Sequence, residues 1–251
     1  MNYHQNLAQT NWELPPEQYD LPHGEVHLWR WHLDVKPAVR QALESHLHPT
    51  ERERFAAFHY ARDRHQHTVA RSRLRQLLGG YLGLPPKAVK FNYAAHGKPV
   101  LPSDFSDLQF NLSHAGGWGL AAVTRTYSIG VDVEPIHDSF SVAALVRRFF
   151  SPREIPVVLA GQHRSFYLAW TRKEAIIKAH GDGLALPLHQ FGVTVEDQEP
   201  VRVLHLDWAP EEVPTWRLHS FMVAENTPGA VAWRGPEQTL RFFTFSEQGV
   251  D

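Results

Sequence analysis

The chain contains no cysteine, and this absence removes several kinds of chemistry at once. Disulfide bonds, thiol nucleophiles and zinc sites built on thiolates are all excluded. No apolar run approaches the roughly 18 or more residues that a membrane span requires. Residues 1–22 also lack the basic segment followed by an apolar run that marks a signal peptide. We therefore expect a cytoplasmic protein with no membrane partner.

The chain also lacks the basic excess of a general nucleic-acid binder. Its formal net charge is -2 over 251 residues, whereas such a protein needs many cations to neutralise phosphates. The 17 histidines are scattered and do not form helical i, i+4 pairs, so no helix-borne histidine metal site is expected. A hydrophobic content of 43% with 21% charged residues describes a globular protein, long enough for one large domain or two halves.

Residues 166–180 give the clearest secondary-structure signal. They contain no Pro or Gly, are rich in Ala, Leu, Ile, Glu and Lys, and are followed by Gly181 where a helix C-cap would lie. At 3.6 residues per turn, Glu174 and Lys178 fall on the same flank of this helix. One interpretation is an ordinary stabilising i, i+4 pair. The other is a half-buried pair kept for function, because the flank adjoins large aromatic side chains.

The first half of the chain begins with a polar, Pro-bearing lead-in, residues 1–23, which we expect to be loosely ordered. A strand is predicted over residues 25–33, followed by helices over 39–47, 51–60 and 65–82, with Thr50 as a helix cap. The later helices are basic. The arginines form either a solvated face or, in part, a groove for a polyanionic small ligand; they are Arg52, Arg54, Arg62, Arg64, Arg71, Arg73 and Arg75.

Three later segments of this half carry polar residues. Residues 88–93 are predicted to form a strand, and residues 95–102 a turn that presents Lys98 either to a phosphate or simply to solvent. A strand follows from residue 108. Ser113 and His114 suggest a hydrolase, but neighbours on a strand point to opposite faces, so His114 is poorly placed to activate Ser113. Separate roles for the two side chains on a ligand are more economical.

Residues 118–124 and 129–135 are predicted to form a hairpin. In its second strand, Asp132 and Glu134 share one face, opposite an apolar face. On an exposed strand this is harmless alternation. In a cleft, two or three carboxylates form the all-oxygen site that Mg²⁺ prefers.

A helix over residues 142–150 and strands over 191–195, 201–206, 216–221 and 230–233 complete the pattern. Each half then carries helices and strands, so we predict an α+β fold of two subdomains that meet near residues 127–128. The expected division is residues 1–127 and 128–251.

Taken in order, several motifs closely resemble those of the 4'-phosphopantetheinyl transferases. They are Gly97-Lys98-Pro99, Phe110-Asn111-Leu112-Ser113-His114, Ile129-Gly130-Val131-Asp132-Val133-Glu134, Arg148-Phe149-Phe150-Ser151 and Trp170-Thr171-Arg172-Lys173-Glu174-Ala175-Ile176-Ile177-Lys178-Ala179. The resemblance runs from about residue 49 to residue 188. The doubled length and residues 49–54 are similar to the Sfp-type branch rather than to the short holo-acyl-carrier-protein synthases. Each motif alone is unspecific, but five in order are a strong signal.

This resemblance implies the transfer of the 4'-phosphopantetheine arm of coenzyme A to a serine hydroxyl of an apo acyl or peptidyl carrier protein. The reaction would release adenosine 3',5'-bisphosphate and require Mg²⁺, with Mn²⁺ as an alternative. Carriers of fatty-acid, polyketide and nonribosomal peptide biosynthesis are the implied partners. The implied fold has two similar α+β halves related by a pseudo-twofold axis, with the active site in the cleft between them, and a monomer suffices.

The resemblance also implies roles for single residues. The metal ligands would be Asp132, Glu134 and Glu174, and the catalytic residues Glu174, Lys178 and Asp132. Glu174 is the candidate base, directly or through a metal-bound water, and Lys178 would stabilise the leaving phosphate. The residues implied to bind coenzyme A are Arg54, Lys98, Asn111, Ser113, His114 and Lys178.

The implied 3'-phosphate region departs from some relatives, which carry more lysine and a threonine there. This chain offers His65, His67 and Thr68 instead. If His114 or His67 must be cationic to hold the phosphate, coenzyme affinity should weaken as the pH rises through the histidine pKa. The alternative function is a non-catalytic coenzyme A or carrier-protein binding module of the same fold.

Overall fold

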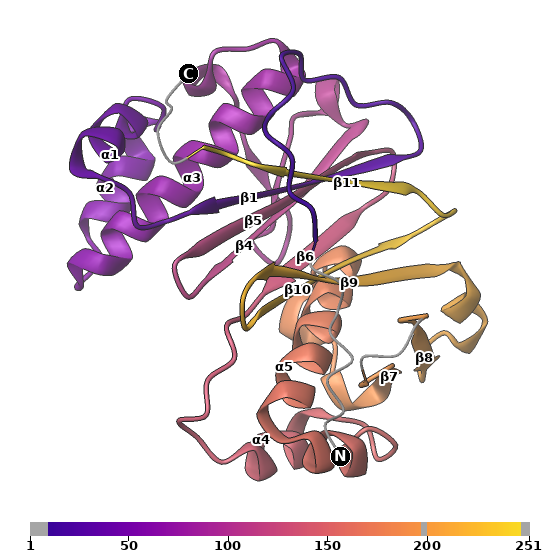
Figure 1. Cartoon of the computed structure of the whole chain (residues 1–251). Helices are drawn as coiled ribbons and strands as arrows, with labels where there is room; N and C mark the ends of the chain where they lie inside the picture. Colours follow the sequence, from indigo (N-terminus) through magenta and orange to yellow (C-terminus); the bar gives the residue numbers. More distant parts are fainter. Residues whose placement is uncertain (1–9, 197–199, 247–251) are drawn as a thin grey trace.

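The computed structural model describes residues 10–196 and 200–246, which form two larger and two small β-sheets, with helices on the outer sides of the larger two (Figure 1). The elements of the first half are β1 (Glu25–His32), α1 (Pro37–Glu44), α2 (Pro49–Ala56), α3 (Ala61–Leu82), β2 (Asn92–Tyr93), β3 (Pro99–Val100), β4 (Leu108–Ala115) and β5 (Trp118–Arg125). Those that follow are β6 (Ile129–Val133), α4 (Val142–Phe149), α5 (Ile155–His180), β7 (Phe191–Val193), β8 (Val203–Leu206), β9 (Trp216–Ala224), β10 (Thr227–Arg234) and β11 (Thr239–Thr244). Short 3-10 helices span Pro86–Ala88, Ser103–Phe105, Gly183–Ala185, Leu188–Gln190 and Pro210–Thr215.

The two halves repeat one topology. In the first sheet β1 pairs with β5 and β5 with β4, and in the second sheet β6 pairs with β10 and β10 with β9, all antiparallel. In the sequence, a long helix follows the first strand of each set: α3 lies between β1 and β4, and α5 between β6 and β9. Both helices end at a left-handed glycine, Gly83 after α3 and Gly181 after α5. A small two-stranded sheet follows each long helix, β2–β3 in one half and β7–β8 in the other. The predicted α+β fold of two similar halves is confirmed.

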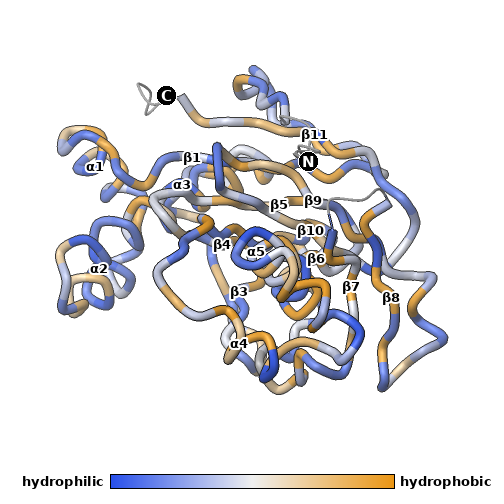
Figure 2. Tube along the Cα trace, turned by 60° about the horizontal axis from the view of Figure 1, so that its bottom comes forward, coloured by the Kyte–Doolittle hydropathy of each residue, from blue (hydrophilic) through white to orange (hydrophobic). Residues whose placement is uncertain are grey.

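Three apolar clusters hold the layers together. One packs α1 and α3 against the first sheet, another packs α4 and α5 against the second, and the third lies between the two sheets. Ile129, Val131 and Val133 of β6 all belong to this third cluster, as the alternation in β6 predicted. Figure 2 shows hydrophobic segments along the central strands, whereas α2 at the periphery is mainly hydrophilic.

The predicted hairpin of residues 118–135 is wrong. β5 pairs with β1 and β4, whereas β6 pairs with β10 in the other sheet. The chain leaves the first sheet through Thr126, whose φ of 78° is unusual for a residue with a branched side chain. The polar turn that suggested a hairpin therefore connects the two halves, and it places β6 at their junction.

β11 was not predicted, and it runs parallel to β1 at the edge of the first sheet. Residues 10–23 also contact this half: Tyr19 stacks on Trp29 with ring centroids 5.2 Å apart, and Leu21 is buried. Residues 1–9, which complete the expected lead-in, lie outside the described residues. The division of the chain at residues 127 and 128 stays a prediction.

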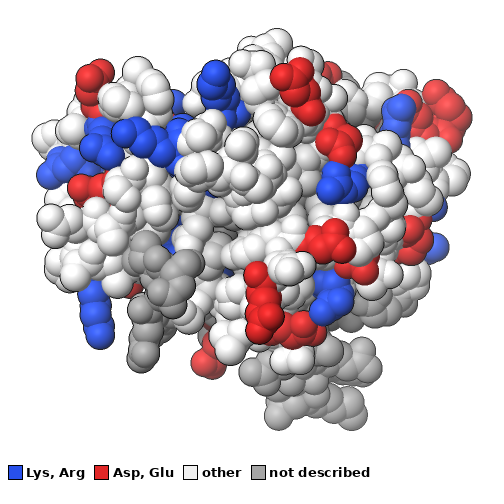
Figure 3. All heavy atoms as spheres, turned by 90° about the horizontal axis from the view of Figure 1, so that it is seen from above, with Lys and Arg blue, Asp and Glu red and all other residues white. Residues whose placement is uncertain are grey.

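The basic helices differ in two ways from the prediction. His48, not Thr50, is the N-cap of α2, where it forms a capping box with Glu51. Of the arginines expected mainly on a solvated face, three are buried: Arg71, Arg73 and Arg75. Arg52 and Arg54 on α2 and Arg62 at the start of α3 are exposed, and Arg64 is half-buried. Figure 3 shows Lys and Arg gathered on the α1–α2 side of the face seen there.

The predicted helix over residues 166–180 is confirmed as the C-terminal part of α5, which kinks at Gln162. Over the described residues, no helix combines the length and the apolar character needed to cross a bilayer. The cytoplasmic location stays a prediction.

Candidate active site

The contact between β6 and α5 positions the central acidic and basic side chains. A Cβ atom on Gly130 would lie 2.0 Å from the Ala175 carbonyl oxygen and 2.3 Å from the Ala179 backbone nitrogen. Only glycine permits this approach of a helix to a strand. Gly130 and Asp132 share one face of β6 because side chains alternate along a strand. The close approach therefore brings Lys178 of α5 to Asp132.

Asp132 lies at the centre of a small polar cluster built from both halves. Its Oδ1 accepts hydrogen bonds from Lys178 Nζ at 2.6 Å and from Ser113 Oγ at 2.8 Å. Lys178 also donates to Ser113 Oγ at 2.9 Å and to the Val131 carbonyl oxygen at 3.2 Å. Asp132 is only 3% exposed, and its buried Oδ2 has no hydrogen-bond partner among residues 10–196 and 200–246. A buried carboxylate oxygen left without a donor favours a cation or a ligand proton beside it.

Burial and neighbouring charges raise the pKa values of two further carboxylates, Glu134 and Glu174. The pKa of Glu134 is raised to about 7, first by burial and then by the Asp132 carboxylate, with Lys178 opposing the increase and Glu174 adding to it. The pKa of Glu174 is raised by burial and then by Asp132, with Lys178 opposing. A cluster that resists ionisation in this way would gain stability from an added cation.

These residues have the chemistry to bind a divalent ion, but their side chains are not arranged around one. Carboxylate oxygens are the ligands that Mg²⁺ prefers, and the unpartnered Asp132 Oδ2 is available. Over the described residues, however, no three His, Cys, Asp or Glu side chains are arranged so that they could hold a metal ion. Ligation by all three predicted carboxylates requires side chains to turn from their present positions.

Lys98 ties the turn before β3 to the junction of the halves. Its Nζ donates to the Ile129 carbonyl oxygen at 2.9 Å, to the Lys178 carbonyl oxygen at 2.7 Å and to Ser128 Oγ at 3.3 Å. Burial lowers the pKa of Lys98 to about 8. The ammonium predicted to face a phosphate or solvent thus binds backbone oxygens of β6 and α5.

A cavity of about 300 Å³ lies beside these groups, between the two halves. Lys98 and Asn111 line it from the first half, and Glu174 and Lys178 line it from the second. Asn111 also joins the halves, because its Oδ1 accepts a hydrogen bond from the Val131 backbone nitrogen at 2.9 Å. Four of the predicted site residues therefore surround one cavity.

His114, at the end of β4, belongs to a second group. Its ring meets that of His67 edge-on, with centroids 4.7 Å apart. The pKa of His114 is lowered to about 4, first by burial and then by the positive charges of His67 and Lys178. The pKa of His67 is lowered by burial and then by the nearby Arg54, which is exposed on α2. Groups that disfavour one another's positive charge create a potential that attracts an anion.

The structure thus brings Ser113, Asp132 and Lys178 into contact and sets His114 beside His67, whose pKa is in turn affected by Arg54. The sequence analysis missed Gly130, although a glycine inside a strand signals a close backbone approach. It also missed the ion pair between Lys173 and Glu154, with Nζ and Oε2 2.9 Å apart and both side chains buried. This pair anchors α5 one residue before Glu174. The position of Lys173 beside the apolar stripe of the helix could have indicated a buried, paired lysine.

Comparison with known proteins gives matches over both halves. Residues 128–232 match the family model described as the 4'-phosphopantetheinyl transferase superfamily, and residues 31–126 match the one described as 4'-phosphopantetheinyl transferase, N-terminal. The chain is 35% identical over 235 residues to the 4'-phosphopantetheinyl transferase HetI of Nostoc sp. strain PCC 7120. The alignment covers 91% of this chain and 96% of that protein.

Two further relatives match over less of their length. Identity is 33% with the 4'-phosphopantetheinyl transferase Sfp of Bacillus subtilis strain 168, over 63% of this chain and 71% of that protein. It is 27% with the human L-aminoadipate-semialdehyde dehydrogenase-phosphopantetheinyl transferase, over 76% of this chain and 68% of that protein.

Proposed function

The chain belongs to the 4'-phosphopantetheinyl transferases, and from this premise we propose that it transfers the 4'-phosphopantetheine arm of coenzyme A to a serine hydroxyl of an apo carrier protein. The products are the holo carrier protein and adenosine 3',5'-bisphosphate. The observation that carries the proposal is the contact of Lys178 and Ser113 with Asp132, beside a cavity lined by both halves.

In the proposed reaction the serine oxygen of the carrier attacks the phosphorus that bears the pantetheine arm. A new oxygen–phosphorus bond forms, the bridging bond of the pyrophosphate breaks, and the bridging oxygen leaves with the adenosine bisphosphate. The serine proton must be removed as the bond forms. Glu174 is the proposed base, and its raised pKa makes it a stronger base than an ordinary glutamate.

Lys178 is proposed to stabilise the charge that develops on the leaving phosphate. Its ammonium is held by Asp132 and Ser113, so it is oriented before the substrate arrives. Such fixed positive charge in a half-buried site is worth more than in water, and its removal costs about two or three powers of ten in rate. Asp132 would thus position the lysine as well as bind a metal.

Magnesium is the proposed cofactor, with Asp132, Glu134 and Glu174 as the residues that would hold it. When bound, it supplies positive charge for the pyrophosphate oxygens. Support comes from the oxygen-only donor set, the Asp132 Oδ2 that has no partner among the described residues, and the burial and neighbouring carboxylates that raise the pKa of Glu134.

Coenzyme A is proposed to bind along the cavity between the halves. Lys98, Asn111 and Ser113 would contact it near the pyrophosphate. His114 and Arg54 would hold the 3'-phosphate, which the surrounding positive charge favours. Binding of the phosphate would raise the pKa of His114, because an anion stabilises the imidazolium.

The test is to incubate the protein with coenzyme A, Mg²⁺ and an apo acyl carrier protein and to weigh the carrier. The proposal expects a mass increase of one phosphopantetheine arm on the carrier serine, which chelation of the metal abolishes. Binding of coenzyme A and carrier without a mass increase would indicate the non-catalytic binding module instead. Transfer that survives complete metal removal would contradict the proposed cofactor.

A further inference from the structure

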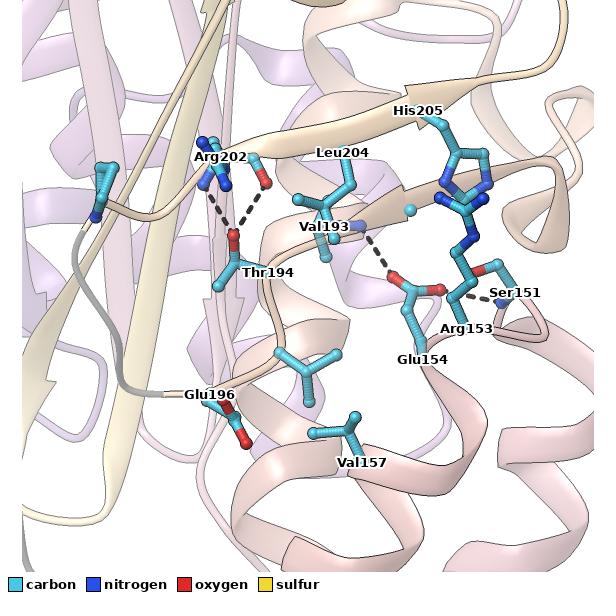
Figure 4. Close-up of a pocket in the computed structure, with 13 residues that line it drawn as sticks. Ser151, Arg153, Glu154, Val157, Val193, Thr194, Glu196, Arg202, Leu204 and His205 are labelled. Atoms are coloured by element: carbon cyan, nitrogen blue, oxygen red, sulfur yellow. Dashed lines mark hydrogen bonds between the residues drawn. The ribbon is translucent and has the colours of Figure 1, made fainter.

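A second pocket, of about 290 Å³, lies between the start of α5 and the β7–β8 hairpin (Figure 4). It shares no lining residue with the cavity between the halves. Its walls come only from the second half. Any ligand it holds therefore occupies a site separate from the one proposed for coenzyme A.

One end of this pocket carries two buried polar atoms that have no partner. Ser151 is 0% exposed, and its Oγ has no hydrogen bond within the described structure. Nδ1 of His205 is likewise buried and unpartnered there. Both atoms flank Gly192: a Cβ on this glycine would lie 2.6 Å from His205 Nδ1 and 3.4 Å from Ser151 Oγ. Because buried polar atoms are nearly always hydrogen-bonded, this end is built to receive a polar ligand group.

The charge at this end favours an anion. Arg153 lines it from the turn before α5, and within the described part of the chain its guanidinium makes no hydrogen bond or ion pair. The neighbouring carboxylate of Glu154 is already saturated. It accepts hydrogen bonds from the Val193 and Ser151 backbone nitrogens, each at 2.8 Å, and Lys173 Nζ lies 2.9 Å away. The acid is thus neutralised, and the arginine remains available.

The rest of the wall at this end is apolar. Val193 and Leu204 line it, whereas Val157 lies further along the pocket, on the side of Glu196 (Figure 4). Leu204 is 43% exposed, unusually open for a large apolar side chain. An anion with an apolar body satisfies both surfaces, whereas inorganic phosphate or water would use only the polar end. We propose that this pocket binds a small organic carboxylate with a short apolar chain. Its carboxylate accepts hydrogen bonds from Arg153, Ser151 and the His205 ring nitrogen.

The experiment titrates the full-length protein, free of coenzyme A, with acetate, butyrate and inorganic phosphate. The ring resonances of His205, assigned with His205→Gln, report occupancy. We expect saturable shifts with butyrate and about tenfold weaker binding of acetate, which lacks two methylene groups to place against the apolar wall. Absence of saturation, or phosphate binding with no advantage of butyrate over acetate, overturns the proposal.

Variants locate the site. Arg153→Ala removes an exposed side chain, so folding is preserved, and we expect it to weaken butyrate binding by about tenfold or more. Arg147→Ala makes the same charge change on an exposed position of α4 outside the pocket and should leave binding unchanged. Ser151→Ala keeps the backbone donor to Glu154 and should also weaken binding. Equal affinities of the two arginine variants would contradict the assignment.

Discussion

Gly130→Ala tests whether the contact between β6 and α5 sets the geometry of the active site. The added Cβ would lie 2.0 Å from the Ala175 carbonyl oxygen, whereas ordinary contacts begin at 3.4 Å. α5 must therefore move away from β6 by about 1.4 Å. Glu174 and Lys178 lie on the same stretch of helix and move with it.

Two effects follow from this displacement. A shift of roughly 1 Å in a positioned group costs about a hundredfold in rate, so we expect kcat for carrier loading to fall by about two powers of ten. Overpacking costs about 1–3 kcal/mol of stability, which lowers Tm by a few degrees to about 10 °C in a protein of this size. The protein should still fold, so rate and stability can be measured on the same sample.

Gly119→Ala is the matched control. A Cβ there would lie 2.4 Å from the Trp31 ring, so it overpacks a strand of the first sheet in a comparable way, away from α5. Its Tm should fall while kcat stays near that of the wild type. The assay is the initial rate of carrier loading followed by mass spectrometry, with Tm from calorimetry. If Gly130→Ala were folded and as active as Gly119→Ala, the positioning argument would be refuted.

Three further predictions concern groups around the site. Because His114 is neutral in the free protein above its pKa of about 4, binding of a 3'-phosphate to its cationic form must take up a proton. Affinity for coenzyme A relative to dephospho-coenzyme A should then fall as the pH rises above about 4 and through the raised pKa of the bound His114, and an equal pH dependence of the two ligands would exclude this role. Lys173→Met leaves the Glu154 carboxylate buried without its cation and should lower the free energy of unfolding in urea by about 3–5 kcal/mol. Lys173→Met combined with Glu154→Gln should cost less than the single change, and additive losses of stability would contradict the pairing. Lys98→Met leaves the Ile129 and Lys178 carbonyl oxygens without their donor and should cost about 1–3 kcal/mol for each oxygen that stays unsatisfied; an unchanged urea midpoint would show that the tie contributes nothing.

Local patterns predicted the elements that carry the chemistry. The C-terminal part of α5 and its end at Gly181 follow from composition and glycine capping, both of which act within one helical turn. The alternation that sets Val131 and Asp132 on opposite faces of β6 follows from the geometry of any strand. These features needed no knowledge of distant partners.

Pairing between distant segments could not be predicted in the same way. The turn after β5 has hairpin composition, yet β6 crosses to the other sheet because its partner, β10, lies about a hundred residues further on. β11 was not predicted from the sequence because its partner, β1, lies more than two hundred residues earlier. The alternation of apolar and polar residues predicts which side chains share a face of a strand, but it does not predict which other strand pairs with it.

The buried arginines show the same limit at the level of side chains. Arg71 and Arg75 are buried because both approach the Glu51 carboxylate, at 3.2 and 2.7 Å. Arg75 also donates to the carbonyl oxygens of Pro86 and Val89. Spacing along α3 cannot reveal these partners, which come from other elements. The sequence therefore indicated a basic face where the structure has buried arginines, two of them paired with Glu51.

Catalysis is proposed to depend on Asp132 of β6 and Glu174 of α5, acting with a divalent ion. The most direct measurement compares the rate of carrier loading by the wild type, Asp132→Ala and Glu174→Ala in the presence of coenzyme A and Mg²⁺. We expect both variants to fold, as judged by circular dichroism, and to load the carrier at least a hundredfold more slowly. Near-normal loading by either folded variant would contradict the account.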